Sequence, residues 1–412
     1  MKTKLFFKDM QKNLPRIIGG SLVVFFLLYL SFNSSVLSSN KSATLIAKDF
    51  IALCAEKKDK AKCYEEEVPK LLEEIPLEKV FSVVREIKKQ DQSYQFCHVL
   101  GHEIGVWEVE RNPDAWIDLM HKNPSDSLCS NGYIHGIIVG RFNKAVLSPA
   151  EIEAIAPDLS RACEPTEDWK PTGLDKAMCY HGMGHVLTQI SGPDMPLSVK
   201  YCRQIAVKHG EDYSKVCISG VFMQIFQPLE PEDFALIERL PVKPTKKTLV
   251  SFCGTYPTEI ERSQCFGEGW PLFQDELKTA EGIQSFCTLS ENALTQRDCF
   301  TTVLSIGARG SLWNPQKQEA LCVQLPERQA QTCFNFLAEA FVEEDRTQIQ
   351  SAVDVCKRTP AEFKDGCFGY LLALSDFTFG GDTAAKKQLC EAFPDDWRKR
   401  CEAGERPPVT RL

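Results

Sequence analysis

The sequence predicts an all-α fold, in which disulfide-stapled helix-turn-helix repeats form a solenoid behind an N-terminal transmembrane anchor. Three observations support this prediction. A basic N-terminus is followed by an uncharged and mostly apolar segment. All 18 cysteines lie after that segment. The C-terminal cysteines recur every 34 or 35 residues, and a fixed period in this range is typical of a repeat solenoid.

The first element expected along the chain is the anchor. Residues 1–16 carry five Lys or Arg and one Asp, whereas residues 17–32 carry no charge. We expect 1–16 to be a cytoplasmic tail by the positive-inside rule, 17–32 to be a signal anchor, and 33–45 to be a polar stalk. A cleaved signal peptide is the alternative. Either interpretation places the remaining chain outside the cytoplasm, in the periplasm or the extracellular space.

Composition narrows the function classes. The 412-residue chain is 43% hydrophobic, 25% charged and has a net charge of −8, which is typical of a folded globular protein without a basic patch for nucleic acid. An even number of cysteines in an exported chain predicts up to nine disulfides. No CxxC sequence is present, which argues against zinc ribbons, thioredoxin-like redox motifs and covalent haem attachment.

The regular part of the array spans residues 249–404 and contains two interleaved sets of cysteines. The first set is Cys253, Cys287, Cys322, Cys356 and Cys390, and the second is Cys265, Cys299, Cys333, Cys367 and Cys401. Four units place Pro four residues after the first cysteine, where it would open the second helix of the repeat. A disulfide within each repeat would close a loop of about 12 residues and contribute roughly 3 kcal/mol. The unit length resembles that of tetratricopeptide and Sel1-type repeats, and this resemblance of period and helix pairing implies an architecture rather than an activity.

Looser repeats are expected over residues 46–226. The expected disulfides there are Cys54–Cys63, Cys97–Cys129, Cys163–Cys179 and Cys202–Cys217. The proline-rich segment 227–248 interrupts the period, so we expect it to separate these repeats from the regular array. Residues 405–412 would form a short tail.

Histidines are concentrated in the N-terminal repeats. Five of the seven lie within six residues after a cysteine, in CHVLGHEIG (97–105), CSNGYIHG (129–136) and CYHGMGH (179–185). These five are His98, His102, His135, His181 and His185. The corresponding position after Cys217 holds Met223.

The spacing of these histidines predicts that their side chains converge. His98 with His102, and His181 with His185, are four residues apart and would share a helix face. Equivalent helices of stacked repeats lie side by side, so imidazoles from neighbouring units could meet. Glycines beside the histidines would let the helices approach closely or leave room for a ligand. Glu103 follows His102 and is a candidate metal ligand or catalytic acid and base.

Imidazole ligands are typical of zinc, copper and iron sites. Thiolates would be oxidised and could not take part. Packing and hydrogen bonding of the histidines are the alternative, and a haem pocket is the least favoured interpretation.

Two functions follow from this pattern. The first is a membrane-anchored extracytoplasmic metalloprotein with a multi-histidine site, which could support metal-dependent catalysis on a substrate that the sequence does not specify. The second is a non-catalytic scaffold that binds a protein or peptide partner on its solenoid surface, with histidines that are structural or sense pH.

Overall fold

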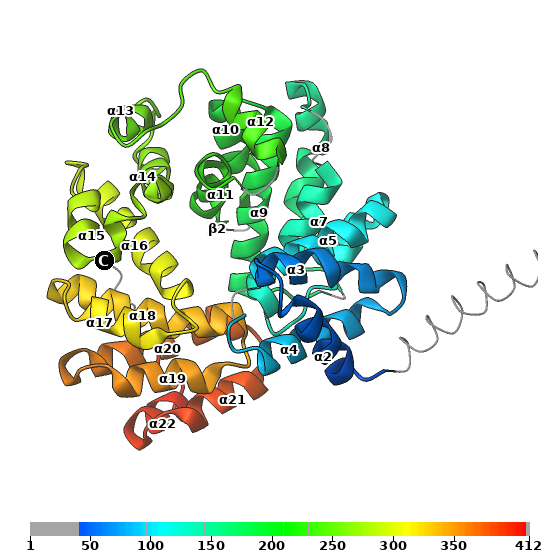
Figure 1. Ribbon diagram of the computed structural model, residues 1–412. Helices are drawn as coiled ribbons and strands as arrows, with labels where there is room; N and C mark the ends of the chain where they lie inside the picture. The colour runs from blue at the N-terminus through cyan, green and yellow to red at the C-terminus, as the bar shows by residue number, and fades with distance from the viewer. Residues whose placement is uncertain are drawn as a thin grey trace, which may run out of the picture. The chain divides into compact units, whose positions relative to one another are not determined.

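The computed structural model describes residues 41–94, 97–142, 146–167, 169–208, 210–228 and 231–408. Over these residues the chain has 21 α-helices, five short 3-10 helices and one two-stranded sheet, which confirms the all-α prediction (Figure 1). The predicted tail 1–16, the anchor 17–32 and residues 33–40 of the predicted stalk lie outside the described residues. Residues 43–45, which we expected to belong to the stalk, instead begin a helix. Within the described ranges, no helix is long and apolar enough to cross a membrane.

The chain divides into two compact units, and the boundary between them in the sequence falls between Asp91 and Gln92. In the first unit, the described elements are α2 (Ala43–Cys54), α3 (Lys60–Glu67), η1 (Pro69–Glu73) and α4 (Leu77–Gln90). A disulfide between Cys54 and Cys63 joins α2 to α3. The Tyr64 hydroxyl donates a hydrogen bond of 2.7 Å to the Asp91 carboxylate, so α3 is tied to the end of this unit.

The second unit begins with the irregular repeats. Its elements up to residue 238 are α5 (His98–Arg111), η2 (Pro113–Ala115), α6 (Trp116–Met120), η3 (Leu128–Asn131), α7 (Gly132–Phe142), α8 (Pro149–Ala162), α9 (Gly173–Ser191), α10 (Met195–Ile205), β1 (Val207–Lys208), β2 (Glu211–Asp212), α11 (Ser214–Phe226) and α12 (Pro231–Glu238). The two strands pair antiparallel. The segment 227–248, which we expected to separate two halves of the chain, lies inside this unit and contains α12.

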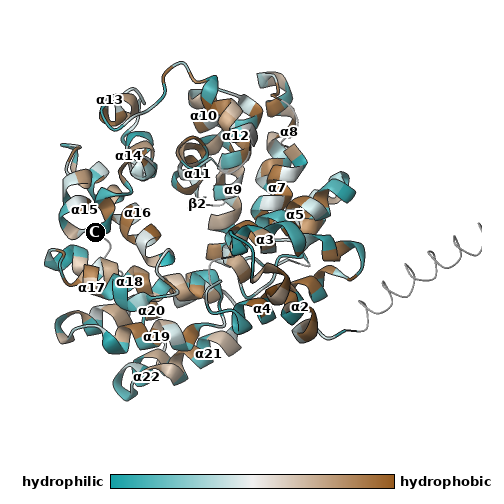
Figure 2. Cartoon of the chain, viewed as in Figure 1, coloured by the Kyte–Doolittle hydropathy of each residue, from teal (hydrophilic) through white to brown (hydrophobic). Residues whose placement is uncertain are grey.

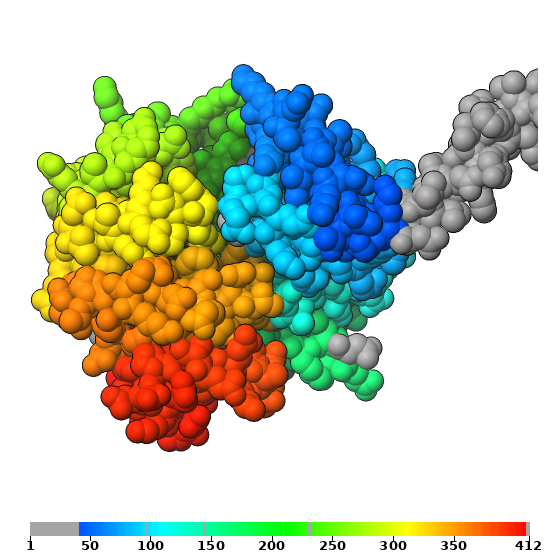
Figure 3. Space-filling view, turned by 60° about the horizontal axis from the view of Figure 1, so that its bottom comes forward, coloured from blue at the N-terminus to red at the C-terminus, as the bar shows by residue number. Residues whose placement is uncertain are grey.

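The regular repeats follow. They comprise α13 (Leu249–Gly254), α14 (Glu259–Glu268), η4 (Trp270–Phe273), η5 (Glu276–Lys278), α15 (Ala280–Cys287), α16 (Ala293–Arg309), α17 (Pro315–Cys322), α18 (Glu327–Glu344), α19 (Ile349–Arg358), α20 (Ala361–Phe379), α21 (Thr383–Ala392) and α22 (Asp395–Glu402). Each pair of helices carries one cysteine of each set, and Figure 3 shows the last repeats as successive layers.

All 18 cysteines are paired, in the pairs expected from their spacing. The aromatic residue after the second cysteine packs in the core, as shown by the low exposure of Phe266, Phe300, Phe334 and Phe368. Most labelled helices in Figure 2 show both hydrophilic and hydrophobic residues, as expected for helices that bury one face. The disulfides and these aromatic residues are therefore part of the core of the first four regular repeats.

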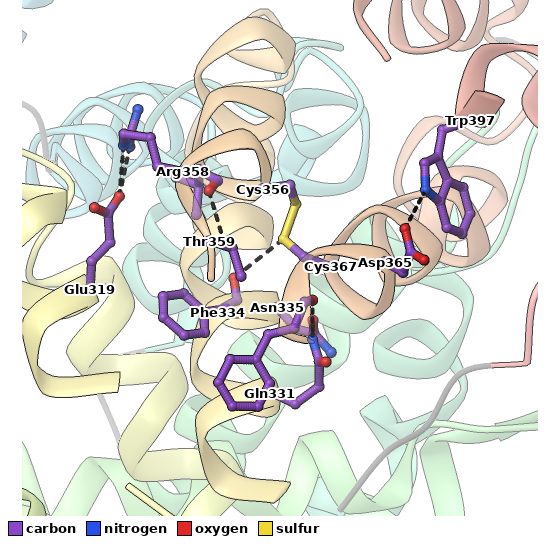
Figure 4. The surroundings of a disulfide bond; sticks show 12 residues. Glu319, Gln331, Phe334, Asn335, Cys356, Arg358, Thr359, Asp365, Cys367 and Trp397 are labelled. Atoms are coloured by element: carbon purple, nitrogen blue, oxygen red, sulfur yellow. Dashed lines mark hydrogen bonds and ion pairs between the residues drawn. A yellow bond between two sulfur atoms is a disulfide. The ribbon is translucent and has the colours of Figure 1, made fainter. Parts of the chain in front are cut away.

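Figure 4 shows how adjacent repeats meet around the Cys356–Cys367 disulfide. The Arg358 guanidinium at the end of α19 pairs with Glu319 on α17, with two nitrogen–oxygen distances of 2.8 and 2.9 Å. The Trp397 indole on α22 donates to Asp365 on α20 at 3.1 Å. Polar contacts, one exposed and one partly buried, therefore complement the apolar packing between repeats.

Three of the four prolines after the first cysteine lie one position earlier than we expected, and Pro257 lies two positions earlier, just before the N-cap Thr258. Pro326, Pro360 and Pro394 are the N-cap residues of their helices rather than the first helical residues. Their φ values lie between −50° and −58° with extended ψ values, which suits a cap. In the repeat without this proline, the side chain of Asn292 caps α16 by accepting a hydrogen bond from the Thr295 amide.

The repeats curve so that late helices return to early ones. In addition to the contacts between consecutive repeats, α18 contacts η3 and α20 contacts α9. Arg346, just after α18, is buried and donates to Asp175 Oδ1 at 2.7 Å, Thr172 Oγ1 at 2.8 Å and the Ser125 carbonyl at 2.7 Å. A buried ion pair thus joins regions of the second unit that are far apart in sequence.

Candidate functional site

The five histidines singled out in the sequence lie on three neighbouring helices. His98 and His102 are on α5, His135 is on α7, and His181 and His185 are on α9. Helix α7 packs against both α5 and α9. The stacking of repeats therefore brings the three histidine-bearing segments together, as the spacing predicts.

Glycines allow α5 and α7 to approach at backbone distance. A Cβ atom added at Gly132 would overlap the His98 carbonyl oxygen, and one added at Gly136 would overlap that of His102. Gly182 plays a similar part between α7 and α9, because an added Cβ would lie 2.8 Å from Cδ2 of His135. Of the two roles expected for these glycines, the structure therefore supports close helix approach.

The first nitrogen pair joins α5 to α7. Nε2 of His98 lies 3.2 Å from Nδ1 of His135, and the ring centroids are 4.9 Å apart. The other nitrogen of His135, Nε2, lies 2.8 Å from the Met178 carbonyl oxygen. A carbonyl oxygen can only accept, so Nε2 carries the proton and Nδ1 of neutral His135 presents a lone pair to His98.

The second nitrogen pair lies within α9. Nε2 of His185 is 3.2 Å from Nε2 of His181. Nδ1 of His185 contacts Oε1 of Gln224, whose amide nitrogen faces the Asp233 carboxylate. The carboxylate fixes the orientation of the amide, so its oxygen accepts the Nδ1 proton. Nε2 of neutral His185 therefore presents a lone pair to His181.

His98 and His181 face these lone pairs, and each has more hydrogen-bond acceptors around it than N–H groups to donate. His98 also has a hydrogen bond to the backbone of Cys129, and His181 has one to the backbone of Val216. Both bonds raise the pKa of the ring, as a carbonyl acceptor does. A neutral imidazole has one N–H, so neither ring satisfies both its carbonyl and its neighbouring histidine. Each pair would be completed by a cation between its nitrogens.

A proton is a poor candidate for that cation. Burial lowers the pKa of His98 to about 3, with further contributions from the charges of His102 and His185. Burial, and then the neighbouring histidines, hold the pKa values of His135 and His181 well below their ordinary value. Burial also lowers the pKa of His185, although Gln224 and Asp233 oppose the shift. The site thus disfavours protonated rings at neutral pH.

These shifts predict that the metal-free protein loses stability in mild acid. In the unfolded chain a histidine has a pKa of about 6.5, whereas His98, His135 and His181 stay neutral when folded. The unfolded state binds more protons below that value, so the stabilisation is present above about pH 6.5 and is lost as the pH falls. From about pH 7.5 to about pH 5.5, we expect the unfolding free energy to fall by about 4 kcal/mol. Denaturant titrations of chelator-treated protein with intact disulfides, carried out at both pH values, measure this fall in the unfolding free energy.

The control for this prediction is the double variant His98→Asn with His181→Asn, which removes two of the three groups. Its loss over the same range should shrink to about 1.4 kcal/mol. An equal loss in both proteins would show that other groups carry the pH dependence.

His102 and Glu103 lie at the edge of this arrangement. Nδ1 of His102 is 3.8 Å from Oε1 of Glu103, the next residue in the chain. His98 pairs with His135 across the helices, not with His102 along α5 as we expected. Throughout the described part of the chain, no group of three or more His, Cys, Asp or Glu side chains is arranged to hold a metal ion. The donor atoms of the other four histidines form two pairs.

The two pairs are close together. The ring centroid of His135 lies 5.5 Å from that of His181 and 5.8 Å from that of His185. Two imidazoles on one tetrahedral ion, with metal–nitrogen bonds of about 2.0–2.1 Å, have nitrogens roughly 3.3 Å apart and ring centroids roughly 5 Å apart. The nitrogen separation of 3.2 Å within each pair matches the first of these values. The ring-centroid distances between the pairs are slightly longer than the second.

Helix α11 supplies contacts that the sequence pattern only partly indicated. Sδ of Met223 lies 3.3 Å from Nε2 of His181, and Gln224 binds His185. Met223 follows its cysteine by six residues, as His135 and His185 do. The repeat register therefore identified the position, although methionine and glutamine there do not by themselves indicate a site.

A buried carboxyl group on α14 is a further feature that the sequence reasoning missed. Glu268 accepts hydrogen bonds from Ser219 Oγ at 2.6 Å and Gln227 Nε2 at 3.1 Å. Burial raises the pKa of Glu268 to about 7, although Ser219 and the Arg309 charge oppose the shift. Glu268 lies three residues after its cysteine, at a position where three earlier units have glycine. A glutamate in place of glycine at this repeat position is the sequence feature that could have indicated it.

Comparison of the chain with protein-family models, with curated proteins and with solved structures finds no match.

Proposed function

We propose that the protein is a membrane-anchored extracytoplasmic metalloprotein in which histidines of α5, α7 and α9 bind a transition metal. The observation that carries the proposal is the shortage of protons in the two nitrogen pairs. Nδ1 of His135 and Nε2 of His185 present lone pairs to His98 and His181 at 3.2 Å. Burial lowers the pKa of all four rings, so a metal ion is the better cation for these sites.

The surroundings of the rings support this proposal. Metal-bound histidines usually donate their second N–H to a carbonyl or carboxylate, which fixes the tautomer and orients the ring. Here Met178 and Gln224 accept from His135 and His185. The backbones of Cys129 and Val216 accept hydrogen bonds from His98 and His181, respectively. Zinc, copper and iron all accept such imidazole ligands.

The proposal assigns no catalytic step to Glu103. Its described contact is with the neighbouring His102, at the edge of the site. His102 itself is proposed as an outer member, because its charge acts on the pKa values of His98 and His185.

The regular repeats from α13 to α22 contain none of the five histidines. We propose that they form a solenoid scaffold, with a surface available to a protein or peptide partner. In a purely structural alternative, this scaffold would be the whole function and the histidines would only pack.

Metal content tests the proposal. The chain from residue 43 onward, which contains every helix and strand that the structure describes, is produced in an oxidising compartment without a histidine tag and analysed for metals before and after exposure to zinc, copper and iron. We expect stoichiometric metal in the unaltered protein, and its loss in the double variant His181→Ala with His185→Ala.

The matched control is His121→Phe. His121 lies outside the five and stacks on Trp169, with ring centroids 4.6 Å apart, and phenylalanine preserves the stacking. This variant should keep its metal. Absence of metal from all three proteins after reconstitution would reject the metalloprotein proposal and leave the scaffold.

A further inference from the structure

From the position of Met223, we infer that the histidine site binds copper(I) and prefers it to zinc because the thioether of Met223 is an additional ligand. This inference rests on the proposed metal site and specifies which ion it takes. It concerns the edge of the site formed by α9 and α11.

The contact between Met223 and the histidines is imposed by the backbone. Helices α9 and α11 cross at two glycines: a Cβ added at Gly184 would overlap the Cys217 carbonyl oxygen, and one added at Gly220 would overlap that of His181. Met223 lies one turn after Gly220, so the crossing directs it toward α9. Its sulfur lies 3.3 Å from Nε2 of His181.

The atoms that meet there are all electron-pair donors. Nε2 of His185 presents a lone pair, because its Nδ1 proton is directed at Gln224. The Met223 sulfur has no proton to give. His181 has one N–H at most for His185, Met223 and the backbone of Val216. Two nitrogens and a sulfur thus converge with too few protons between them.

The chemical type of the donors selects the metal. Thioether sulfur is a soft ligand that binds copper(I) well, whereas zinc is bound by imidazole, carboxylate or thiolate. All 18 cysteines are in disulfides, so no thiolate is present to attract zinc. Met223 is therefore the soft ligand of this site, and its position corresponds to those of His135 and His185 in their repeats.

The test compares the copper(I) and zinc affinities of the unaltered protein, Met223→Leu and Met183→Leu. Copper(I) affinity is measured without oxygen by competition with a chromogenic chelator, and zinc affinity is measured with a fluorescent indicator. Leucine has a similar volume to methionine but lacks the sulfur. Met183 is a buried residue of α9, two positions from both His181 and His185 and hence on the other side of that helix, which makes it a matched control.

We expect Met223→Leu to weaken copper(I) binding by at least about tenfold, while zinc binding changes by less than about twofold. Met183→Leu should leave both affinities unchanged. The inference is overturned if Met223→Leu keeps its copper(I) affinity or loses affinity for both ions equally. In either case, metal binding that His181→Ala with His185→Ala abolishes would still support the histidine site. If the unaltered protein binds neither ion, the proposed function fails together with this inference.

Discussion

Replacing Gly136 with alanine should destabilise the protein by about 3 kcal/mol or more and weaken metal binding. The new Cβ would overlap the carbonyl group of His102, which is backbone and cannot rotate away. Helices α5 and α7 would have to separate, which would move His98 away from Nδ1 of His135. The gain in helix propensity from glycine to alanine, about 1 kcal/mol, is too small to offset this clash. Denaturant unfolding and metal titration measure the two effects.

Gly254→Ala is the matched control for this variant. Gly254 ends α13, and a Cβ added there would meet no atom within 4 Å. We expect its unfolding free energy to stay the same or rise by up to about 1 kcal/mol, with metal binding unchanged. If Gly136→Ala behaves like Gly254→Ala, the close approach of α5 and α7 is not what positions the histidines.

Removing the Arg346 side chain should have the second large effect. Its guanidinium pairs with Asp175 and also donates to Thr172 and to the backbone of Ser125. Arg346→Ala would leave the buried Asp175 carboxylate without this cation, and breaking a buried pair in this way costs about 3–5 kcal/mol. Because Asp175 is in the first turn of α9, we also expect weaker metal binding at His181 and His185.

Arg358→Ala provides the comparison for Arg346. Arg358 also makes two short contacts with a carboxylate, that of Glu319, but its side chain is 40% exposed, compared with 8% for Arg346. We expect Arg358→Ala to lower the unfolding free energy by no more than about 1 kcal/mol. Equal losses in the two variants would show that the contact of α18 and α20 with early helices contributes little to stability.

The disulfide pairs and helical repeats followed from the cysteine spacing. Two cysteines 11 or 12 residues apart, the first near the end of one helix and the second about two turns into the next, have their Cα atoms 5.4–5.5 Å apart, well within the range for a disulfide. A repeated period also fixes which helices are neighbours. The concentration of histidines on α5, α7 and α9 was therefore predictable before their contacts were known.

The pairing of His98 was not predictable from helical spacing. Residues four apart share a helix face, and this favoured His102 as its partner. The glycines at the crossing of α5 and α7 bring another backbone closer than one helical turn, so His135 takes that place. Sequence periodicity contains no measure of this distance between helices.

The conformation of the turn before α7 could not be predicted from the sequence either. Ser127, Cys129, Ser130 and Asn131 have φ values between 50° and 58°, a left-handed conformation that costs roughly 1–2 kcal/mol per residue without glycine. Glu344 on α18 accepts hydrogen bonds from Ser130 Oγ and from the backbone amide of Cys97. A residue more than 200 positions away thus supports this turn, and no local pattern could reveal it.

Anomalous diffraction from crystals of the untagged protein, loaded with copper or zinc, tests the metal site most directly. We expect a strong peak at the absorption edge of the metal, bound by ring nitrogens of His98, His135, His181 or His185 at about 2.0–2.1 Å. A peak only at surface residues, or none at these four rings in fully loaded crystals, would show that the histidines do not form a metal site.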